Sequence, residues 1–249
     1  MVAMPVLSLN SVCKAYGDTR ALDNVSLEFA DNCITAVIGR SGCGKSTLLR
    51  ACNGLVVPDK GTVEVFGQPL DHNELPRLRR RMGYAVQGTG LFPHLSARAN
   101  ITLLAALEGW EQDRIRQRLS ELLTLTQLTD DQLDKYPHQL SGGQQQRVGL
   151  CRAMMLRPKI LLLDEPFAAI DPITRTDIHR QLLQLHQAEP TTAVLVTHDM
   201  REAMRLADHV VVMEEGRISS SRAAEDLRQD NPDMDPEELL QLLMAEAGP

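Results

Sequence analysis

Residues 39–47, with the sequence G-R-S-G-C-G-K-S-T, constrain the fold of this chain more than any other segment. The β-branched run Ile34–Ile38 precedes them and predicts a strand, and Lys45–Cys52 continues without a helix breaker, which predicts a helix. Where a glycine loop joins a strand to a helix, backbone N–H groups and the helix N-terminus attract an anion. The spacing Gly-x-x-x-x-Gly-Lys-Ser is typical of loops that bind the phosphates of a nucleoside triphosphate.

All nine residues of this loop are therefore candidate nucleotide contacts. Lys45 would add a full positive charge beside the terminal phosphates, and the Ser46 hydroxyl would hold a Mg²⁺ ion that bridges them. A glycine turn that merely reverses the chain is the alternative, which the flanking strand and helix disfavour. The loop residues are Gly39, Arg40, Ser41, Gly42, Cys43, Gly44, Lys45, Ser46 and Thr47.

The composition argues against several classes of protein. Lys and Arg number 26 against 33 Asp and Glu, and the net charge of -7 disfavours a broad nucleic-acid or anionic-membrane surface. The five cysteines form no C-x-x-C pair, so neither a zinc site nor a disulfide framework is indicated. Met1–Asn10 lacks a signal-peptide pattern, and no segment approaches the roughly 20 apolar residues of a membrane span. We expect a globular protein of a reducing cytoplasm that does not itself cross a membrane.

The order of apolar segments predicts an α/β fold with a mixed central sheet. Early half-exposed strands are expected near residues 7–12 and 25–29, and helical spacing alternates with strands in the second half of the chain. The roughly 70 residues between the strand at 82–86 and the next strand look largely helical, too many for one crossover, so we expect an inserted helical subdomain at about 88–157. Continuous apolar runs that suit buried parallel strands occupy Ile160–Leu163, Ala193–Val196 and Val210–Met213.

Ionisable residues follow two of these buried strands. Asp164 and Glu165 end one strand, where we expect Asp164 to hold Mg²⁺ and Glu165 to orient the attacking water and accept its proton. His198 follows the next strand and reaches the same sheet edge, where it could bond the γ-phosphate or hold the water in line. An ordinary acidic turn and a structural histidine are the alternatives, which the preceding phosphate loop disfavours.

A second glycine-rich helix start occurs at Leu140–Arg147, where Ser141 is a natural N-cap. Taken alone, a flexible glycine hinge is the favoured interpretation, unless this helix start faces the phosphate of a second chain. Gln87 ends the strand at 82–86 and can reach a metal ion or water by its amide oxygen, and Tyr16 is a candidate platform for adenine. Each of these two signals is weak by itself.

Together these motifs resemble, in the same order, those of the ATP-binding cassette (ABC) ATPases, and the resemblance covers about residues 6–218. It implies a P-loop NTPase with a RecA-like core and mixed central sheet, an N-terminal antiparallel β subdomain and an inserted helical subdomain. The ATPase domain would span residues 1–220, with the Ser219–Ser221 cluster marking its end and a short helical tail at 221–249. The motifs that carry the resemblance are residues 39–47, Gln87, Leu140–Arg147, Leu161–Glu165, Ile170–Asp171 and Thr197–His198.

The resemblance also implies a head-to-tail dimer with ATP and Mg²⁺ as ligands. ATP would lie between the phosphate loop of one chain and Ser141, Gly142, Gly143 and Gln144 of the other, and Asp171 would cross the dimer interface. Tyr16 would stack on adenine, Gln87 would sense Mg²⁺, Glu165 would be the general base and His198 the switch. Ala168-Ala169-Ile170-Asp171 stands where the family more often has Ser-Ala-Leu-Asp, a departure that leaves the acid Asp171 intact.

Within the family, residues 79–87, 90–94 and 171–175 are similar to importers of glycine betaine and other quaternary-amine osmoprotectants. This implies a peripheral subunit at the cytoplasmic face of the cell membrane, with permease subunits docking near Leu91–Asn100, a solute-binding protein acting indirectly and no nucleic-acid partner. The alternatives are the ATPase of another transporter, for amino acids, other small solutes, lipids or export, and a soluble ABC ATPase acting on nucleic acid or ribosomes.

The tail has a helix signal of its own. Asp235 is a candidate N-cap, Pro236 suits the first helical position, and an apolar face follows. About eleven residues are marginal as a free helix, so we expect this one to dock on the body of the protein or on a second copy. The apolar face comprises Leu239, Leu240, Leu243 and Met244.

Overall fold

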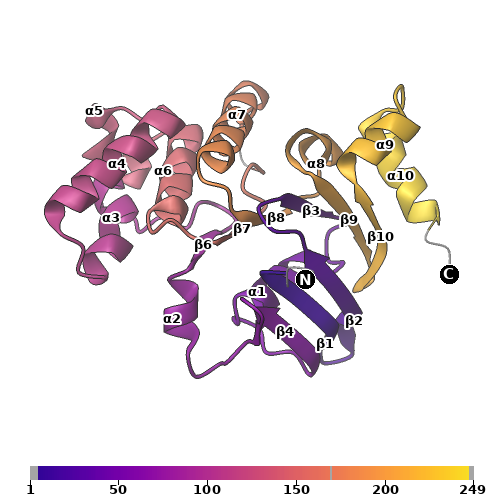
Figure 1. The fold of residues 1–249 in the computed structure, drawn as a ribbon. Coiled ribbons are helices and arrows are strands. Elements are labelled where there is room, and N and C mark those ends of the chain that lie inside the picture. The colour runs from indigo at the N-terminus through magenta and orange to yellow at the C-terminus, as the bar shows by residue number, and fades with distance from the viewer. Residues whose placement is uncertain (1–4, 169, 247–249) are drawn as a thin grey trace. The chain divides into compact units, whose positions relative to one another are not determined.

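The computed structural model describes residues 5–168 and 170–246, which divide into two compact units (Figure 1). The first unit combines the chain up to residue 79 with the chain from residue 191 onward, and the second unit comprises residues 80–190. The expectations for Met1–Met4 and Ala169 lie outside the described residues. Among the residues that are described, no helix combines the length and the apolar character needed to cross a bilayer.

An antiparallel sheet in the order β2-β1-β4-β5 opens the first unit. Alternate residues of β2 from Val25 to Phe29 are buried, and the Leu7↔Phe29 and Leu9↔Leu27 pairs belong to the core, because one face of this sheet packs on it. The predicted half-exposed strands are thereby confirmed. The elements of this part are β1 (Leu7–Tyr16), β2 (Thr19–Phe29), β4 (Lys60–Val65), β5 (Gln68–Pro69) and α2 (Leu75–Arg79).

A mixed sheet in the order β10-β9-β3-β8 forms the rest of the first unit. Strand β3 runs parallel to β8 and β9, whereas β10 is antiparallel to β9. Every residue of β3 and β8 is buried, as expected for central parallel strands. The elements are β3 (Ile34–Ile38), α1 (Lys45–Cys52), β8 (Thr192–Val196), α8 (Met200–Leu206), β9 (His209–Glu214), β10 (Arg217–Ala223), α9 (Ala224–Asp230) and α10 (Pro236–Glu246).

The C-terminal helix α10 docks on the body of its own unit, in contact with α8, β9 and β10 (Figure 1). Leu239 and Leu243 are buried there, and Asp235 begins the helix by accepting a hydrogen bond from the N–H of Glu237 at 2.8 Å. Docking on the body was one of the two outcomes expected. The serine cluster at 219–221 does not end the body, however, because it lies within the edge strand β10, whose polar residues pair with β9.

The second unit contains a parallel strand pair and a group of helices (Figure 1). Strand β6 pairs with β7 along Met82↔Ile160 to Ala85↔Leu163, and helix α6 packs against α3, α4 and α7. The elements are β6 (Met82–Ala85), α3 (Ala97–Leu107), α4 (Gln112–Thr126), α5 (Asp130–Leu133), the 3₁₀ turn η1 (Pro137–Gln139), α6 (Gly142–Met154), β7 (Ile160–Asp164) and α7 (Pro172–Ala188).

Candidate nucleotide-binding site

The loop between β3 and α1 is shaped by glycines that pack on backbone. Gly44 has φ 110° and lies just before α1, and a Cβ at this position would be 2.1 Å from the carbonyl oxygen of Ala21. At Gly39 a Cβ would be 2.1 Å from the carbonyl oxygen of Met213. Only glycine tolerates both the conformation and the close approach, so the loop is a preformed backbone cradle at a helix N-terminus.

The Lys45 side chain folds back over this cradle. It is 4% exposed, and its Nζ donates hydrogen bonds to the carbonyl oxygens of Gly39 at 2.8 Å and Arg40 at 2.9 Å. No carboxylate of the described residues forms an ion pair with this ammonium group. A buried cation that is bonded only by loop groups attracts an anion, which fits a phosphate group in the cradle.

His198 leaves the same sheet edge as the phosphate loop. Val37 and Val196 are partners across the parallel strands β3 and β8, and the Thr197 N–H donates to the carbonyl oxygen of Val37 at 3.2 Å. Gly39 and His198 each lie two residues beyond this pair, so both emerge at the carboxyl ends of adjacent strands. The first unit therefore brings the phosphate loop and the exposed His198 together.

The residues around His198 hold its backbone in place. The Thr197 hydroxyl donates to Glu202 Oε2 at 2.6 Å, and Asp199 caps α8 by accepting from the N–H of Arg201 at 2.8 Å. Sequence reasoning missed these partners, although the Asp199 to Glu202 spacing is a capping signal. It also missed Gly216, whose N–H donates to the carbonyl oxygen of Cys43 in the phosphate loop at 3.0 Å, and no sequence pattern indicates that contact.

Tyr16 lies at the end of β1 in the same unit. Its side chain is 53% exposed, and Lys14 Nζ lies 5.6 Å from the ring centroid. Lys14 also pairs with Asp59 at 2.7 Å, which fixes the ammonium group beside the ring. An exposed ring suits stacking on a base, and the assignment to adenine stays a prediction.

In the second unit, Gln87 and Glu165 follow a pair of parallel strands in the same way. Ala85 and Leu163 are register partners, and the Gln87 Nε2 donates a hydrogen bond to Glu165 Oε2 at 3.3 Å. Glu165 has φ 43°, a left-handed conformation that is strained for a non-glycine residue and is concentrated at functional sites. Asp164 is 3% exposed at the end of β7. The structure thus joins Gln87 to Glu165, one of the two strand-end carboxylates.

The second glycine-rich helix start is a packed capping box. The Gln144 N–H donates to Ser141 Oγ at 3.3 Å, and the Ser141 N–H donates to Gln144 Oε1 at 2.9 Å. Gly143 is buried, and a Cβ there would be 2.3 Å from Thr174 Cγ2 on α7, so this glycine lets α6 approach α7 closely. Ser141 and Gly142 are exposed. This arrangement leaves the helix N-terminus open to an outside anion and differs from a flexible hinge.

Asp171 begins α7, with Pro172 at the first helical position. Its Oδ1 accepts a hydrogen bond from the N–H of Thr174 at 3.0 Å, and that backbone hydrogen bond is the main reason why the pKa of Asp171 lies below its usual range. The carboxylate is therefore charged at neutral pH and exposed. It has a structural task as an N-cap whether or not it also contacts a second chain.

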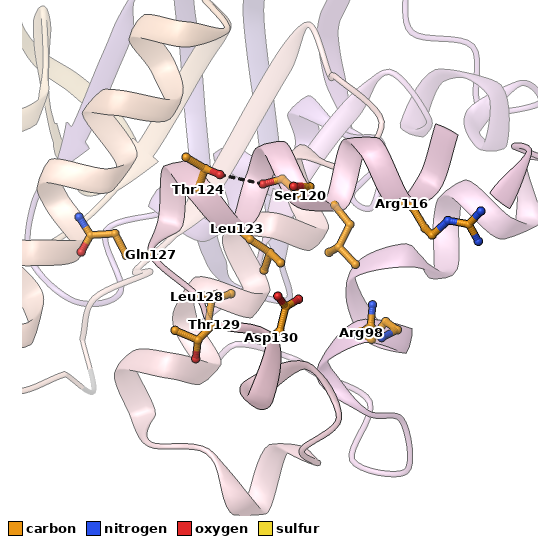
Figure 2. Close-up of a pocket in the computed structure, with 10 residues that line it drawn as sticks. Arg98, Arg116, Ser120, Leu123, Thr124, Gln127, Leu128, Thr129 and Asp130 are labelled. Carbon is orange, nitrogen blue, oxygen red and sulfur yellow. Dashed lines mark hydrogen bonds between the residues drawn. The ribbon is translucent and has the colours of Figure 1, made fainter. Parts of the chain in front are cut away.

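A separate hollow of about 720 Å³ opens on α4 and the segment that leads into α5 (Figure 2). The two arginine side chains that line it already form ion pairs, Arg98 with Asp134 and Arg116 with Asp113. None of the predicted site residues lines it, and it has no glycine cradle. Its lining consists of Arg98, Arg116, Leu119, Ser120, Leu123, Thr124, Gln127, Leu128, Thr129 and Asp130.

Comparison with known proteins decides the family. Residues 22–168 match the family model described as ABC transporter. This chain belongs to the ABC transporter family. It is an ABC-type ATPase subunit, and the predicted α/β fold with its antiparallel and mixed sheets is confirmed.

Three curated relatives illustrate the range of printed functions. The glycine betaine uptake system ATP-binding protein YehX of Escherichia coli (strain K12) is 43% identical over 86% of this chain and 69% of its own length. The choline transport ATP-binding protein OpuBA of Bacillus subtilis (strain 168) is 39% identical over 94% and 62%. The sulfate/thiosulfate import ATP-binding protein CysA of Synechocystis sp. is 42% identical over 88% and 61%. This chain spans 56% to 69% of the length of the first curated relatives it matches.

Solved structures include a similar cassette in dimeric form. The ATP-binding cassette MJ0796, solved as a dimer in a post-hydrolysis state bound to ADP and Pi, is 32% identical with a TM-score of 0.80. The match covers 88% of this chain and 98% of that one.

Proposed function

We propose that this ABC ATPase hydrolyses ATP to drive a membrane importer of quaternary-amine osmoprotectants such as glycine betaine. The ATPase activity rests on the cradle with buried Lys45 and on the Gln87–Glu165 hydrogen bond. The proposed cargo is supported by the similarity to ATP-binding proteins of glycine betaine uptake and choline transport. An importer of sulfate is the second candidate because the sulfate relative is 42% identical.

The nucleotide would lie between two copies of the chain. The phosphate loop of one copy would hold the phosphates, and the exposed helix start at Ser141 and Gly142 of the second copy would face the γ-phosphate. Gln144 would keep this helix start rigid through the capping box, and Asp171 would approach the partner with its charge. The dimeric, ADP-bound state of MJ0796 supports this arrangement.

The catalytic chemistry would belong to the strand-end residues. Glu165 would accept a proton from the attacking water as the water oxygen bonds to the γ-phosphorus and the bond from that phosphorus to the β–γ bridging oxygen breaks, which releases ADP. Gln87 would hold the Glu165 carboxylate in place. His198, at the same sheet edge as the phosphate loop, would contact the γ-phosphate. Ser46, Gln87 and Asp164 offer the hydroxyl, amide and carboxylate oxygens that suit Mg²⁺, and the ion would neutralise charge that develops on the phosphates.

Exposed apolar side chains of the second unit support a permease docking surface. Phe92 in the predicted segment Leu91–Asn100 is 44% exposed, and on α3 Leu104 and Leu107 are 41% and 72% exposed. Asn100 itself is fully buried and holds the segment from inside, since its Oδ1 accepts from the Phe92 N–H at 2.8 Å. We place the permease contact on Phe92, Leu104 and Leu107, at the cytoplasmic face of the membrane.

The variant Glu165→Gln tests the catalytic assignment. It keeps size and hydrogen bonding but removes the base, so we expect ATP binding within about twofold of wild type and turnover reduced by at least about 100-fold. Size-exclusion chromatography with ATP and Mg²⁺ should show an accumulated dimer. The exposed Glu238→Gln on α10 is the matched control and should turn over normally. Turnover of Glu165→Gln near the wild-type rate would refute the assignment.

The cargo is tested with the assembled transporter. The chain, its co-purified membrane subunits and the solute-binding protein are reconstituted in vesicles with ATP inside, and uptake of labelled glycine betaine and of labelled sulfate is measured. Uptake of glycine betaine supports the proposal, whereas uptake of sulfate alone would replace it with the second candidate. Co-purification of ribosomes or nucleic acid in place of membrane subunits would contradict import altogether.

A further inference from the structure

Arg152 joins helix α6 to the turn that follows Gln87. Its Nη1 donates a hydrogen bond to the carbonyl oxygen of Gly90 at 2.8 Å, and its Nη2 donates to the carbonyl oxygen of Thr89 at 2.9 Å. A planar guanidinium that bridges two successive carbonyls fixes both their position and their direction, which a single ammonium group cannot do. The guanidinium also lies 6.0 Å from the ring centroid of Phe92.

The turn that Arg152 holds is unusual in its backbone. Gly88, Thr89 and Gly90 have φ angles of 73°, 64° and 52°, so three successive residues are left-handed. The Gly90 N–H donates to the carbonyl oxygen of Gly88 at 2.8 Å, which tightens the turn further. Thr89 is β-branched, and a positive φ is costly for such a residue, so tertiary contacts must stabilise the conformation.

Helix α6 provides the support from beneath the turn. Burial lowers the pKa of Arg152, in accord with a guanidinium withdrawn from water. One helical turn earlier, a Cβ at Gly149 would lie 3.7 Å from the carbonyl oxygen of Thr89, in ordinary contact. The far end of the segment is anchored separately, because Asn100 Nδ2 donates to the carbonyl oxygen of Phe92 at 3.1 Å.

We propose that Arg152 is a positioning residue that keeps the Gln87 amide against Glu165 by holding the turn directly after Gln87. The same helix begins at Ser141, so Arg152 ties the helix start that would face the partner's nucleotide to the residue that orients the base. Phe92 of the docking surface belongs to the same held segment. Movement of a docked permease would thereby reach both catalytic elements through this one side chain. The inference rests on the proposed roles of Gln87 and Glu165.

The test compares Arg152→Met, Arg152→Lys and Gln87→Ala in the full-length protein. For Arg152→Met we expect kcat to fall by at least about tenfold while the Kd for ATP stays within about twofold, because the change displaces Gln87 and leaves the phosphate loop intact. Arg152→Lys can reach one of the two carbonyls and should restore part of kcat. Arg180→Met, an exposed arginine on α7, is the matched control and should match wild type.

The double variant Arg152→Met with Gln87→Ala gives the deciding result. If Arg152 acts through Gln87, the double variant turns over no more slowly than Gln87→Ala alone. If the kcat losses of the two single variants multiply in the double variant, the inference is overturned. An unchanged kcat in Arg152→Met, or a loss of ATP affinity in parallel with kcat, would also overturn it. Should the methionine variant fail to fold, the lysine variant is put through the same cycle. A wild-type rate for both Gln87→Ala and Glu165→Gln would instead refute the proposed function.

Discussion

Replacing Gly44 with alanine should damage the phosphate loop far more than replacing Gly42, although both glycines have a positive φ. At Gly42 φ is 83° and an added Cβ meets nothing within 4 Å, so only backbone strain opposes the change. At Gly44 φ is 110° and the Cβ would be 2.1 Å from the Ala21 carbonyl oxygen, about 0.9 Å inside the shortest separation that real Cβ atoms adopt. Either the loop or strand β2 must therefore move.

These geometries set the expected magnitudes. Strain alone should reduce the free energy of unfolding by about 1 kcal/mol in Gly42→Ala, and strain with displacement should reduce it by about 3 kcal/mol or more in Gly44→Ala. Gly109→Ala, outside the site with φ 70° and open space, is a second control and should match Gly42→Ala. Displacing the loop carbonyls that bind Lys45 should also weaken ATP binding in Gly44→Ala by at least about tenfold.

Urea unfolding of the nucleotide-free variants and titration with ATP measure both effects. We expect Gly44→Ala to have a much lower free energy of unfolding than the two controls. We also expect it to be the one variant of the three that combines this loss of stability with ATP binding weakened by displacement of the loop carbonyls. A Gly44→Ala variant no less stable than Gly42→Ala would show that the close approach to Ala21 does not constrain the loop. That result would refute the account of why glycine is needed there.

Three further predictions concern assembly, the tail and the thiols. ATPase activity per chain should rise with protein concentration, because each site would need two chains; strict proportionality of total activity down to dilute solution would contradict this. Leu243→Ala should speed amide exchange over residues 236–246 by at least about tenfold, while the more exposed Leu242→Ala should not. Burial raises the pKa of the Cys52 and Cys151 thiols to about 12, so a maleimide at neutral pH should leave both unlabelled until urea is added. Mass spectrometry that finds either one labelled in the folded protein would contradict their burial.

The elements with local determinants could be predicted from the sequence. The helix Lys45–Cys52 has the predicted bounds, since a left-handed glycine starts it and a second left-handed glycine, Gly54 with φ 70°, follows its end. Buried strands were recognisable because parallel strands covered on both faces are continuous apolar runs. The Ser141 N-cap was recognisable for a similar reason, because its partner Gln144 lies only three residues away.

Contacts between distant segments could not be predicted in this way. Nothing in the sequence indicates that Gly143 contacts Thr174 or that Arg152 bonds the turn at Thr89, because both depend on how α6 packs. The prediction that the serine cluster at 219–221 ends the body of the protein was wrong, because an edge strand that is paired on one side tolerates polar residues, and such residues are also typical of linkers. The limits of the helical subdomain at about 88–157, and the role of each site residue, stay predictions.

The most direct test of the central claim is a crystal structure of the Glu165→Gln variant with ATP and Mg²⁺. The account predicts a dimer in which the phosphate loop of one copy holds the triphosphate and residues 141–144 of the second copy lie within hydrogen-bond distance of its γ-phosphate. A nucleotide-loaded structure in which residues 141–144 lie far from every triphosphate of the assembly would contradict it.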